Sequence, residues 1–348
     1  MVKILYSVNG DGFGHATRSI PIIQALSKKH KVKAIVGSKR SRDFMKKYIK
    51  NVTAYDSVRF VYEKNCVNVN KTIRNNVSTV VGRSSTLRIL YKFIKNYKPD
   101  VIVVDCDFAT ILTARMFDIP IICVCNIHAM TEMTYDVPKK YKRLYYTQKL
   151  LIKAFTSNVD YHVITTFFYL PVKKKNVFLY PPILRKEIID ITPQRKDYYL
   201  VYQTTATNNK LIRTLKSINA KFVVYGFEKD AVDDNVIFRK TNSDQFFKDF
   251  KDCRACIANG GYTFISEAVS LHKPVLSLPI NGTFEQTLNG LEIKRLGYGD
   301  TCGTVSRKIL LKFIKNNDRY YNRLKTHKKE NNTRIIKKIE DLIKEVTT

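Results

Sequence analysis

The chain has 348 residues, and its 61 Lys and Arg against 30 Asp and Glu give a formal net charge of +31. This length is too great for one ordinary core and predicts two domains, while the lack of an apolar run of ~18 residues excludes a membrane-spanning helix. The charge favours polyanionic partners such as nucleic acid, an anionic membrane surface or phosphorylated substrates, although a genome biased toward Lys, Asn, Ile and Tyr also explains it.

The cysteines indicate a cytoplasmic protein. There are seven of them, an odd number scattered along a chain without a secretory signal, which favours reduced thiols. Cys253 and Cys256 form a C-x-x-C pair, but no second pair stands at zinc spacing. We therefore expect buried structural thiols and no metal site.

Strands and helices alternate through the first half of the chain. Strands are predicted at "VKILYSV", "KVKAIVG", "PDVIVVD", "PIICVCN" and "YHVITTF". Helical patterns such as "TRSIPIIQALSKKH" and "STLRILYKFIKNYK" stand between them. This repetition predicts a parallel, doubly wound sheet over residues 1–176. Residues 177–196, with three prolines, read as a linker. The same alternation then restarts over residues 197–348, which end in a basic helical tail that packs on the surface or crosses back to the first domain.

A glycine-rich loop follows the first predicted strand. Gly10, Gly12 and Gly14 let the chain turn sharply into a helix, whose amino terminus offers free N–H groups to an acceptor or a phosphate. A dinucleotide-binding loop would read G-x-G-x-x-G and would need an acidic residue after the second strand, where residues 38–40 are Ser-Lys-Arg. A phosphorylated nicotinamide cofactor therefore stays open as an alternative. His15 is placed to act as a general base, or simply to cap its helix.

A second motif spans residues 258–299, "ANGGYTFISEAVSLHKPVLSLPINGTFEQTLNGLEIKRLGYG". Its glycine pair leads into a helix at Thr263, which creates a second anion site from backbone N–H groups and a hydroxyl. Glu267 lies one helical turn further, where a carboxylate can accept ribose hydroxyls. Glu285 and Gln286 begin the next helix and suit sugar hydroxyls.

This second motif resembles the nucleotide-sugar signature of GT-B glycosyltransferases. The pattern G-G-x-T-x-x-x-E…P-x-x-x-x-P…(D/E)-Q-x-x-N is similar to that of glucuronosyl- and glucosyltransferases and of the lipid-linked N-acetylglucosaminyltransferase of peptidoglycan synthesis. Together with "GDGFGHATRSIPIIQAL" and "YPPILR", it looks closest to the glycosyltransferase-related (family 28, glucuronosyltransferase-like) proteins of archaea and bacteria. The resemblance implies an α/β fold of two Rossmann-like domains with a cleft between them.

The resemblance also implies roles for matching residues. The diphosphate would be held by Gly260, Gly261 and Thr263, the ribose by Glu267, and the sugar by Glu285 and Gln286 with Asn289 nearby. Thr204 and Thr205 would add to the phosphate site, unless they form an ordinary turn. His15 would be the base that deprotonates the acceptor, oriented by Asp107 as the first match and Asp105 as the second. The sequence "DCD" also spells the metal-binding D-x-D of another glycosyltransferase fold, but here it ends a parallel strand, so we expect no metal.

The implied activity is metal-independent, inverting transfer of a sugar from a nucleoside-diphosphate donor, UDP first, to a hydroxyl acceptor. The nucleotide-sugar is a co-substrate, so no cofactor is expected. Residues 138–155, "PKKYKRLYYTQKLLIKAF", would suit an anionic membrane and a lipid or lipid-linked acceptor, or form a solvated helix over the first sheet. The alternatives are a nucleotide-sugar 2-epimerase of the same fold and a basic nucleic-acid-binding protein. Nucleic acid is not expected as a partner, since the sequence has no RNP, KH or zinc-finger pattern.

Overall fold

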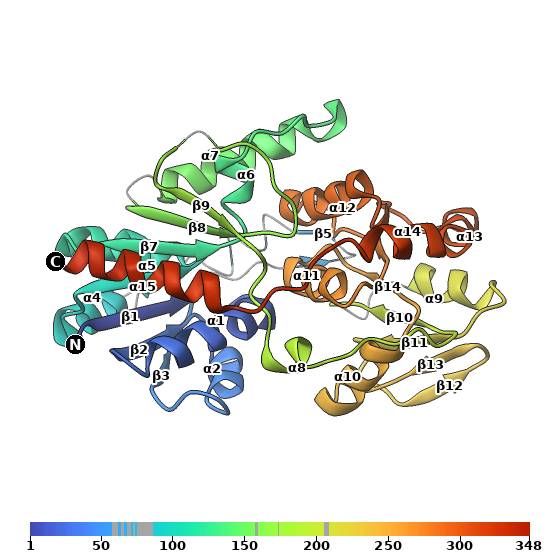
Figure 1. Cartoon of the computed structure of the whole chain (residues 1–348), viewed down its shortest axis with the longest axis horizontal. Coiled ribbons are helices and arrows are strands. Elements are labelled where there is room, and N and C mark those ends of the chain that lie inside the picture. The colour runs from blue at the N-terminus through green and yellow to red at the C-terminus, as the bar shows by residue number, and fades with distance from the viewer. Residues whose placement is uncertain are drawn as a thin grey trace. The chain divides into compact units, whose positions relative to one another are not determined.

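The computed structural model describes residues 1–57, 62–63, 66–67, 71, 74, 86–156, 159–172, 174–204 and 209–348. These residues form two compact units (Figure 1). Unit 1 comprises Met1–Val61, Asn68–Arg185 and Asn331–Thr348, and unit 2 comprises Tyr62–Val67 and Lys186–Glu330. Each unit contains a seven-stranded sheet, so the predicted pair of doubly wound domains is confirmed.

The sheet of unit 1 is parallel throughout and has the order β3-β2-β1-β6-β7-β8-β9. Its strands are β1 (Lys3–Val8), β2 (Lys31–Val36), β3 (Val52–Ala54), β6 (Val101–Asp105), β7 (Ile121–Cys125), β8 (Tyr161–Thr165) and β9 (Val177–Tyr180). Its helices are α1 (Phe13–Leu26), α2 (Lys39–Met45), α4 (Thr86–Tyr97), α5 (Phe108–Ala114), α6 (Ala129–Glu132), α7 (Lys142–Thr156) and α15 (Thr333–Thr347), with 3-10 turns η1 (Arg115–Phe117) and η2 (Lys139–Tyr141).

Both faces of this sheet are covered, as the near-continuous apolar strands require. On one face Val101 and Val103 of β6 pack in a cluster with residues of α1 and α15. On the other face Ile102 and Val104 pack with α4 and α5. The alternation along β6 therefore assigns each side chain to one of two helical layers.

The sheet of unit 2 has the order β12-β13-β11-β10-β14-β15-β16 and is parallel except for β12. Its strands are β10 (Tyr199–Tyr202), β11 (Phe222–Tyr225), β12 (Ala231–Asp233), β13 (Val236–Phe238), β14 (Ala255–Ala258), β15 (Val275–Ser277) and β16 (Gly299–Thr301). Its helices are α8 (Lys186–Ile189), α9 (Asn209–Lys216), α10 (Ser243–Asp252), α11 (Tyr262–Ser270), α12 (Phe284–Leu296), α13 (Arg307–Lys315) and α14 (Asn317–Leu324). A short hairpin, β4 (Tyr62–Glu63) and β5 (Cys66–Val67), is grouped with this unit.

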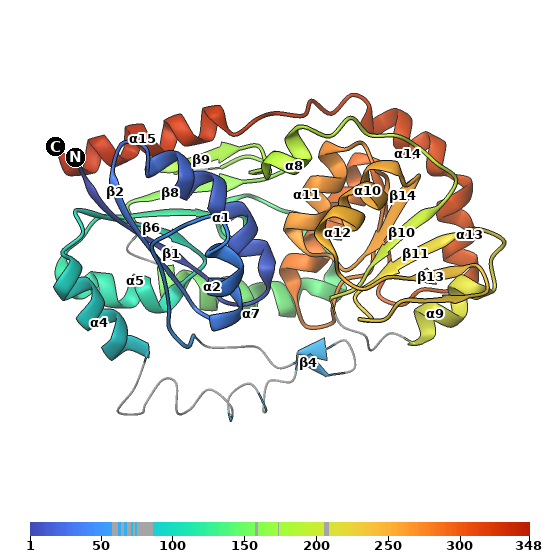
Figure 2. The ribbon, with the colours of Figure 1, turned by 90° about the horizontal axis from the view of Figure 1, so that it is seen from below.

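Two segments differ from the boundaries expected from the sequence. Residues 177–180, expected to begin a linker, form the edge strand β9, which pairs with β8. Helix α15 falls within the boundaries expected for the second domain but belongs to unit 1, where it lies along the first helix and the sheet (Figure 2). Of the two placements expected for the tail, it is the crossing back to the first domain that occurs. The reason is its apolar stripe: Ile335, Ile339 and Leu342 are buried in the cluster that contains α1, and their spacing places them on one helical face.

None of the helices that the structure describes is both long and apolar enough to cross a membrane. Cys253 and Cys256 are buried as expected, with their sulfur atoms 3.8 Å apart. The free thiols are those of Cys106, Cys123, Cys125, Cys253, Cys256 and Cys302.

Candidate active site

The first candidate site lies where the strand order of unit 1 changes direction. From β1 the chain builds one half of the sheet through β2 and β3, and from β6 it builds the other half. Strands β1 and β6 are neighbours, with Val8 paired to Asp105 at their carboxyl ends. Ligands of open α/β sheets bind at such a switch point, because the two loops that leave it diverge.

The glycine loop between β1 and α1 has a specific geometric need at two positions. A side chain on Gly10 would overlap the backbone of Gly37, because this loop passes directly over the one that follows β2. Gly12 has φ of 73° and is the N-cap of α1, and no side chain caps the helix there. Gly14 lies inside the first turn of α1. The amino terminus of α1 is therefore without a side-chain cap and points its backbone N–H groups toward the loop.

His15 and two other side chains of α1 meet the carboxylate of Asp105. The Nδ1 atom of His15 lies 3.0 Å from Oδ1 of Asp105. Arg18 donates from Nη2 to Oδ1 at 2.5 Å and from Nε to Oδ2 at 2.7 Å, and Ser19 donates to Oδ2 at 3.2 Å. The side chain of His15 is 21% exposed, whereas those of Arg18 and Asp105 are 4% and 0% exposed. His15 is thus the member of this cluster that a substrate can reach.

Asp105 and Arg18 each stabilise the ionised form of the other. Burial opposes the charge of Asp105, but the Arg18 guanidinium and the His15 ring hold the pKa of this carboxyl below its ordinary value. Burial likewise opposes the charge of Arg18, but Asp105 raises its pKa above the ordinary value. Asp105 therefore remains an anion that can accept a proton-bearing Nδ1 and leave Nε2 of His15 to act as a base.

Arg18 also approaches His15 directly. Its Nη2 lies 2.8 Å from Nδ1 of His15. The Nδ1 atom can either donate to Asp105 or accept from Arg18, but not both at once, since a neutral imidazole carries one proton. The first arrangement presents a basic Nε2 to a substrate, and the second presents a proton. The contacts of Nδ1 with Asp105 and with Arg18 therefore favour opposite tautomers of His15.

Asp107 does not orient His15, which corrects the pairing expected first from the sequence. Its carboxylate accepts hydrogen bonds from Ser7, Tyr55 and Thr110. Ser7 and Tyr55 lie on the opposite side of the sheet from α1. The reason is Cys106, whose φ of 53° ends the regular alternation of β6. The second candidate, Asp105, is the residue that contacts His15.

Two groups of described side chains bring three atoms capable of metal ligation within 4.8 Å of one another. One consists of His15, Asp105 and Cys106, where the Arg18 cation already occupies Asp105 and opposes a second cation. The other consists of Cys123, His128 and His162, all buried. Burial and the neighbouring His128 lower the pKa of His162 to about 4, so this ring is neutral at physiological pH.

The second candidate site lies at the corresponding switch point of unit 2, between β10 and β14. Strand β14 ends at Ala258, and Gly260 and Gly261 lead into α11. A side chain on Gly260 would come within 2.5 Å of the carbonyl oxygen of Gln286, so glycine lets α11 and α12 approach. Gly261, the N-cap of α11, would meet no atom within 4 Å. A ligand can therefore approach the N–H groups of α11 closely at this point.

The residues predicted to bind the donor lie on α11 and α12 and differ in how deeply they are buried. Thr263 is half-buried in the first turn of α11, and Glu267 is buried one turn further, at 1% exposed. Glu285 and Gln286 are half-buried in the first turn of α12. The side-chain oxygen of Gln286 accepts from the backbone N–H of Ile280 at 2.9 Å.

Asn289 is engaged within the protein. Its amide donates to the carbonyl oxygen of Gly260 at 2.9 Å, and the residue is 3% exposed. The sequence placed it near the donor sugar, whereas its contact positions the glycine loop. It therefore supports the shape of the anion site through the backbone of Gly260.

The sequence did not identify Asn259 or Asn9, and both hold loops at the two switch points. Asn259 accepts from the backbone N–H of Thr204 at 2.8 Å and donates to the carbonyl of Leu278 at 3.1 Å. Asn9 accepts from the N–H of Asp11 at 2.7 Å and donates to the carbonyl of Cys106 at 2.9 Å. Thr204 is exposed beside this site, and Thr205 lies outside the described residues. An asparagine directly after a strand, next to a glycine, was the available signal.

Comparison with known proteins agrees with this architecture. The sequence model of glycosyl transferase family 1 matches residues 2–317. An uncharacterized glycosyltransferase of Methanosarcina acetivorans is 24% identical over 330 residues, which cover 86% of this chain and 85% of that protein.

Solved structures are similar over nearly the whole chain. A UDP-glucosyltransferase from Polygonum tinctorium, capable of glucosylating indoxyl, has a TM-score of 0.70 at 13% identity, covering 99% of this chain and 98% of that one. The glycotransferase of kitacinnamycin has a TM-score of 0.70 at 16% identity and covers 98% of both chains.

Proposed function

Because this chain belongs to glycosyl transferase family 1, we propose that it moves a sugar from a nucleoside-diphosphate donor, a UDP-sugar first, to a hydroxyl acceptor with inversion and without a metal. The coarser part of this statement is established: the chain is a glycosyltransferase with the GT-B fold. The donor, the acceptor and the stereochemical course are the proposal.

The observation that carries the proposal is the contact between His15 and Asp105 at the switch point of unit 1. In our mechanism Nε2 of His15 removes the proton of the acceptor hydroxyl as its oxygen attacks the anomeric carbon. The buried Asp105 anion holds the ring by Nδ1 and stabilises the imidazolium that forms. Attack from the face opposite the leaving group inverts the anomeric centre.

The leaving nucleoside diphosphate needs stabilisation of the negative charge that develops on it. We assign this role to the N–H groups at the start of α11, beside Gly261 and Thr263. Glu267 would accept the ribose hydroxyls, and Glu285 and Gln286 would contact the sugar. Thr204 and Thr205 complete the proposed phosphate contacts. The structurally similar protein of Polygonum tinctorium is a UDP-glucosyltransferase, which supports UDP as the first donor to test.

For the acceptor we propose a lipid or lipid-linked molecule reached at an anionic membrane surface. Helix α7 exposes Tyr146, Leu150 and Leu151, at 61%, 71% and 53%, among its basic residues. Exposed aromatic and aliphatic side chains beside lysines are typical of helices that lie in a membrane interface. The cell location that follows is the cytoplasmic face of a membrane.

The donor half of the proposal is tested by thermal unfolding with UDP, GDP, dTDP and NADPH. We expect UDP to raise the melting temperature of the wild type but not that of the Glu267→Ala variant. Glu228→Ala, at an exposed site of unit 2, is the matched control and should retain the shift. A shift with NADPH alone would refute the proposed donor, and interconversion of the donor sugar without an acceptor would indicate a 2-epimerase.

The catalytic half is tested by donor turnover. With a UDP-sugar that binds, His15→Ala should keep the thermal shift and lose sugar transfer about 10²-fold or more, since general base catalysis contributes that much. Unchanged turnover in this variant would remove His15 from the mechanism.

A further inference from the structure

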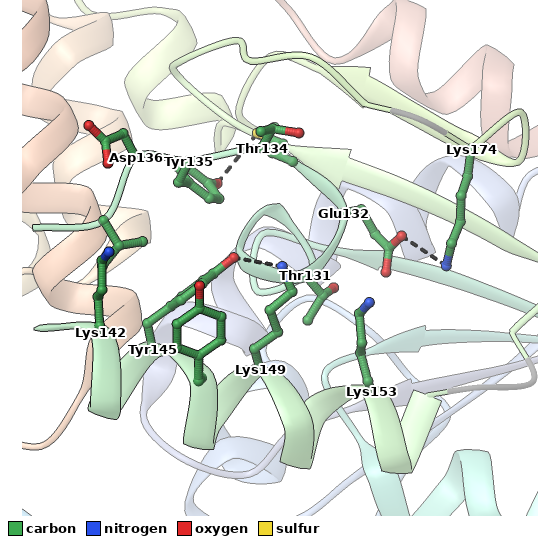
Figure 3. A pocket seen from close by; sticks show the side chains of 13 residues that line it. Thr131, Glu132, Thr134, Tyr135, Asp136, Lys142, Tyr145, Lys149, Lys153 and Lys174 are labelled. Carbon is green, nitrogen blue, oxygen red and sulfur yellow. Dashed lines mark hydrogen bonds and ion pairs between the residues drawn. The ribbon is translucent and has the colours of Figure 1, made fainter. Parts of the chain in front are cut away.

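Unit 1 contains a cavity of about 400 Å³ between α7, the segment that follows α6, and Lys174 (Figure 3). We propose that this cavity binds a phosphate or diphosphate group of the acceptor. This inference rests on the proposed transferase function and deepens it by naming the chemical class of the acceptor. The volume is in the range of sites that hold small molecules.

One stripe of α7 supplies the wall of the cavity. Lys142, Tyr145, Lys149 and Lys153 all line it, and their spacing of three, four and four residues places them on one face of a helix. At a rise of 1.5 Å per residue, the stripe is about 16 Å long. Figure 3 shows the three lysine side chains rising from α7 toward the cavity, with Lys174 reaching in from the opposite side.

Charges of the lining do not balance. Four lysines face two carboxylates, those of Glu132 and Asp136. Glu132 is already paired with Lys174 at 3.0 Å. Burial opposes the charge of Glu132, but the hydrogen bond from Lys174 holds its pKa below the ordinary value, so the pair stays ionic. Among the residues that the structure describes, Lys142 and Lys153 have no ion-pair partner. The net excess is two positive charges (four minus two).

An anionic group explains this arrangement. Lys149 and Lys153 are four residues apart, and like charges at that spacing destabilise a helix. A phosphate or diphosphate placed between them removes the repulsion and accepts from several ammonium groups at once. Lys149 is also oriented, because its Nζ donates to the hydroxyl of Tyr145 at 2.6 Å. A neutral acceptor would leave the excess positive charge of the stripe uncompensated.

The phosphate could belong to a soluble sugar phosphate or to a lipid headgroup. Both present the same group to the lysines, so the shared chemistry is the proposal and the experiment separates the sources. The exposed Leu150 follows Lys149 directly on α7, so an acyl chain attached to the phosphate would pass along that flank of the helix.

The test uses inorganic pyrophosphate in calorimetric titration of the full chain, with excess UDP present to fill the donor site. We expect Lys149→Gln/Lys153→Gln to weaken pyrophosphate binding about tenfold or more, given the strength of charge-assisted contacts. The matched control is Lys92→Gln/Lys95→Gln, two exposed lysines on α4 of the same unit, and it should bind as the wild type does. Equal affinity in the wild type and the cavity variant would overturn the proposal.

A second measurement needs no substitution. Amine acetylation followed by mass spectrometry should show Lys149 and Lys153 protected by pyrophosphate, while Lys92 and Lys95 react at an unchanged rate. Acetylation of Lys149 and Lys153 at the same rate with and without pyrophosphate would contradict the assignment.

Two further arms separate the outcomes. Binding to phosphatidylcholine vesicles that contain phosphatidic acid, but not to phosphatidylcholine alone, would identify a lipid phosphate if the cavity variant loses it. Pyrophosphate binding without vesicle binding would identify a soluble phosphate. If UDP stabilises the protein and pyrophosphate adds nothing, this inference fails while the transferase proposal stands. If pyrophosphate binds at the lysines but UDP does not bind, the donor proposal fails while the anion site at the lysines stands.

Discussion

Replacing Asp105 by Asn tests the reasoning about the catalytic cluster most directly. The substitution keeps the shape of the side chain and removes its charge. Arg18, 4% exposed, would then remain buried without the carboxylate that contacts it at 2.5 and 2.7 Å. His15 would lose the anion that orients its ring.

The size of the effect follows from the ion pair. Two charges about 4 Å apart attract by about 4 kcal/mol at an effective dielectric constant of about 20. Breaking a buried pair by removing one partner costs about 3–5 kcal/mol, because the remaining charge stays desolvated. The amide oxygen of Asn retains one acceptor, worth about 1 kcal/mol. We therefore expect Asp105→Asn to lower the free energy of unfolding of unit 1 by about 3 kcal/mol.

Urea unfolding followed by circular dichroism measures this loss, and hydrogen exchange of β1, α1 and β6 assigns it to unit 1, because a chain of two units need not unfold in one step. A double-mutant cycle isolates the pair. Arg18→Met and Asp105→Asn should couple by about 2 kcal/mol, whereas Arg18→Met and Asp107→Asn should be additive within about 0.5 kcal/mol. Asp43→Asn, at a position 62% exposed, is the control and should change stability by less than about 1 kcal/mol.

The pH dependence of unfolding provides a second measurement on the same set of variants. The folded pKa of Asp105 is lowered, so its contribution is complete above the unfolded value of about 3.9 and is lost as the pH falls through the folded value. Asp105→Asn should remove that part of the acid sensitivity. Coupling of Arg18 to Asp107 in place of Asp105, or no coupling to either, would refute the cluster as described.

Three further results are expected. Since the folded pKa of His162 is about 4 against about 6.5 unfolded, stability should fall by up to about 3 kcal/mol as the pH drops from 6.5 to 4, and His162→Phe should flatten that dependence in urea titrations. Gly261→Ala should leave the melting temperature unchanged but reduce the UDP shift, whereas Gly260→Ala should unfold more readily because its side chain would meet Gln286. Ile339→Ala should cost unit 1 about 2–5 kcal/mol by the cavity that it leaves, while Lys337→Ala, at an exposed position of α15, should not.

Much of the fold was predictable because the apolar strands and amphipathic helices repeat with clear periods. The segments that differed, β9 and α15, depend on partners that periodicity does not name. Strand β9 pairs only with β8 among the described strands, and its sequence "VFLY" precedes two prolines that read as a linker. The apolar stripe of α15 predicted a helix, but such a stripe can pack on the surface of either domain. Its packing against α1 is visible only in the tertiary structure.

The candidate site was predictable in its glycines and in His15, and less so in the residues that hold them. Asp105 and Asp107 have the same parity along an extended strand, so the sequence could not separate them. The positive φ of Cys106 separates them in the structure, and no pattern of residue types signals a left-handed cysteine. Arg18 was visible three residues after His15, but its partner depends on the register of β1 against β6.

At each of the two switch points, one asparagine side chain joins neighbouring loops by hydrogen bonds. Asn9 and Asn259 each accept a backbone N–H through Oδ1 and donate to a carbonyl of another loop through Nδ2. Aspartate in either place would keep the acceptor, lose the donor and turn an anion toward a carbonyl oxygen, at a cost of about 1–3 kcal/mol for the buried Asn259. Asn259→Asp should therefore weaken UDP binding and leave the arrangement of His15 unchanged. Asn9→Asp should slow sugar transfer, while UDP still raises the melting temperature. If both substitutions changed the same property, the two loops would not serve separate halves of the reaction.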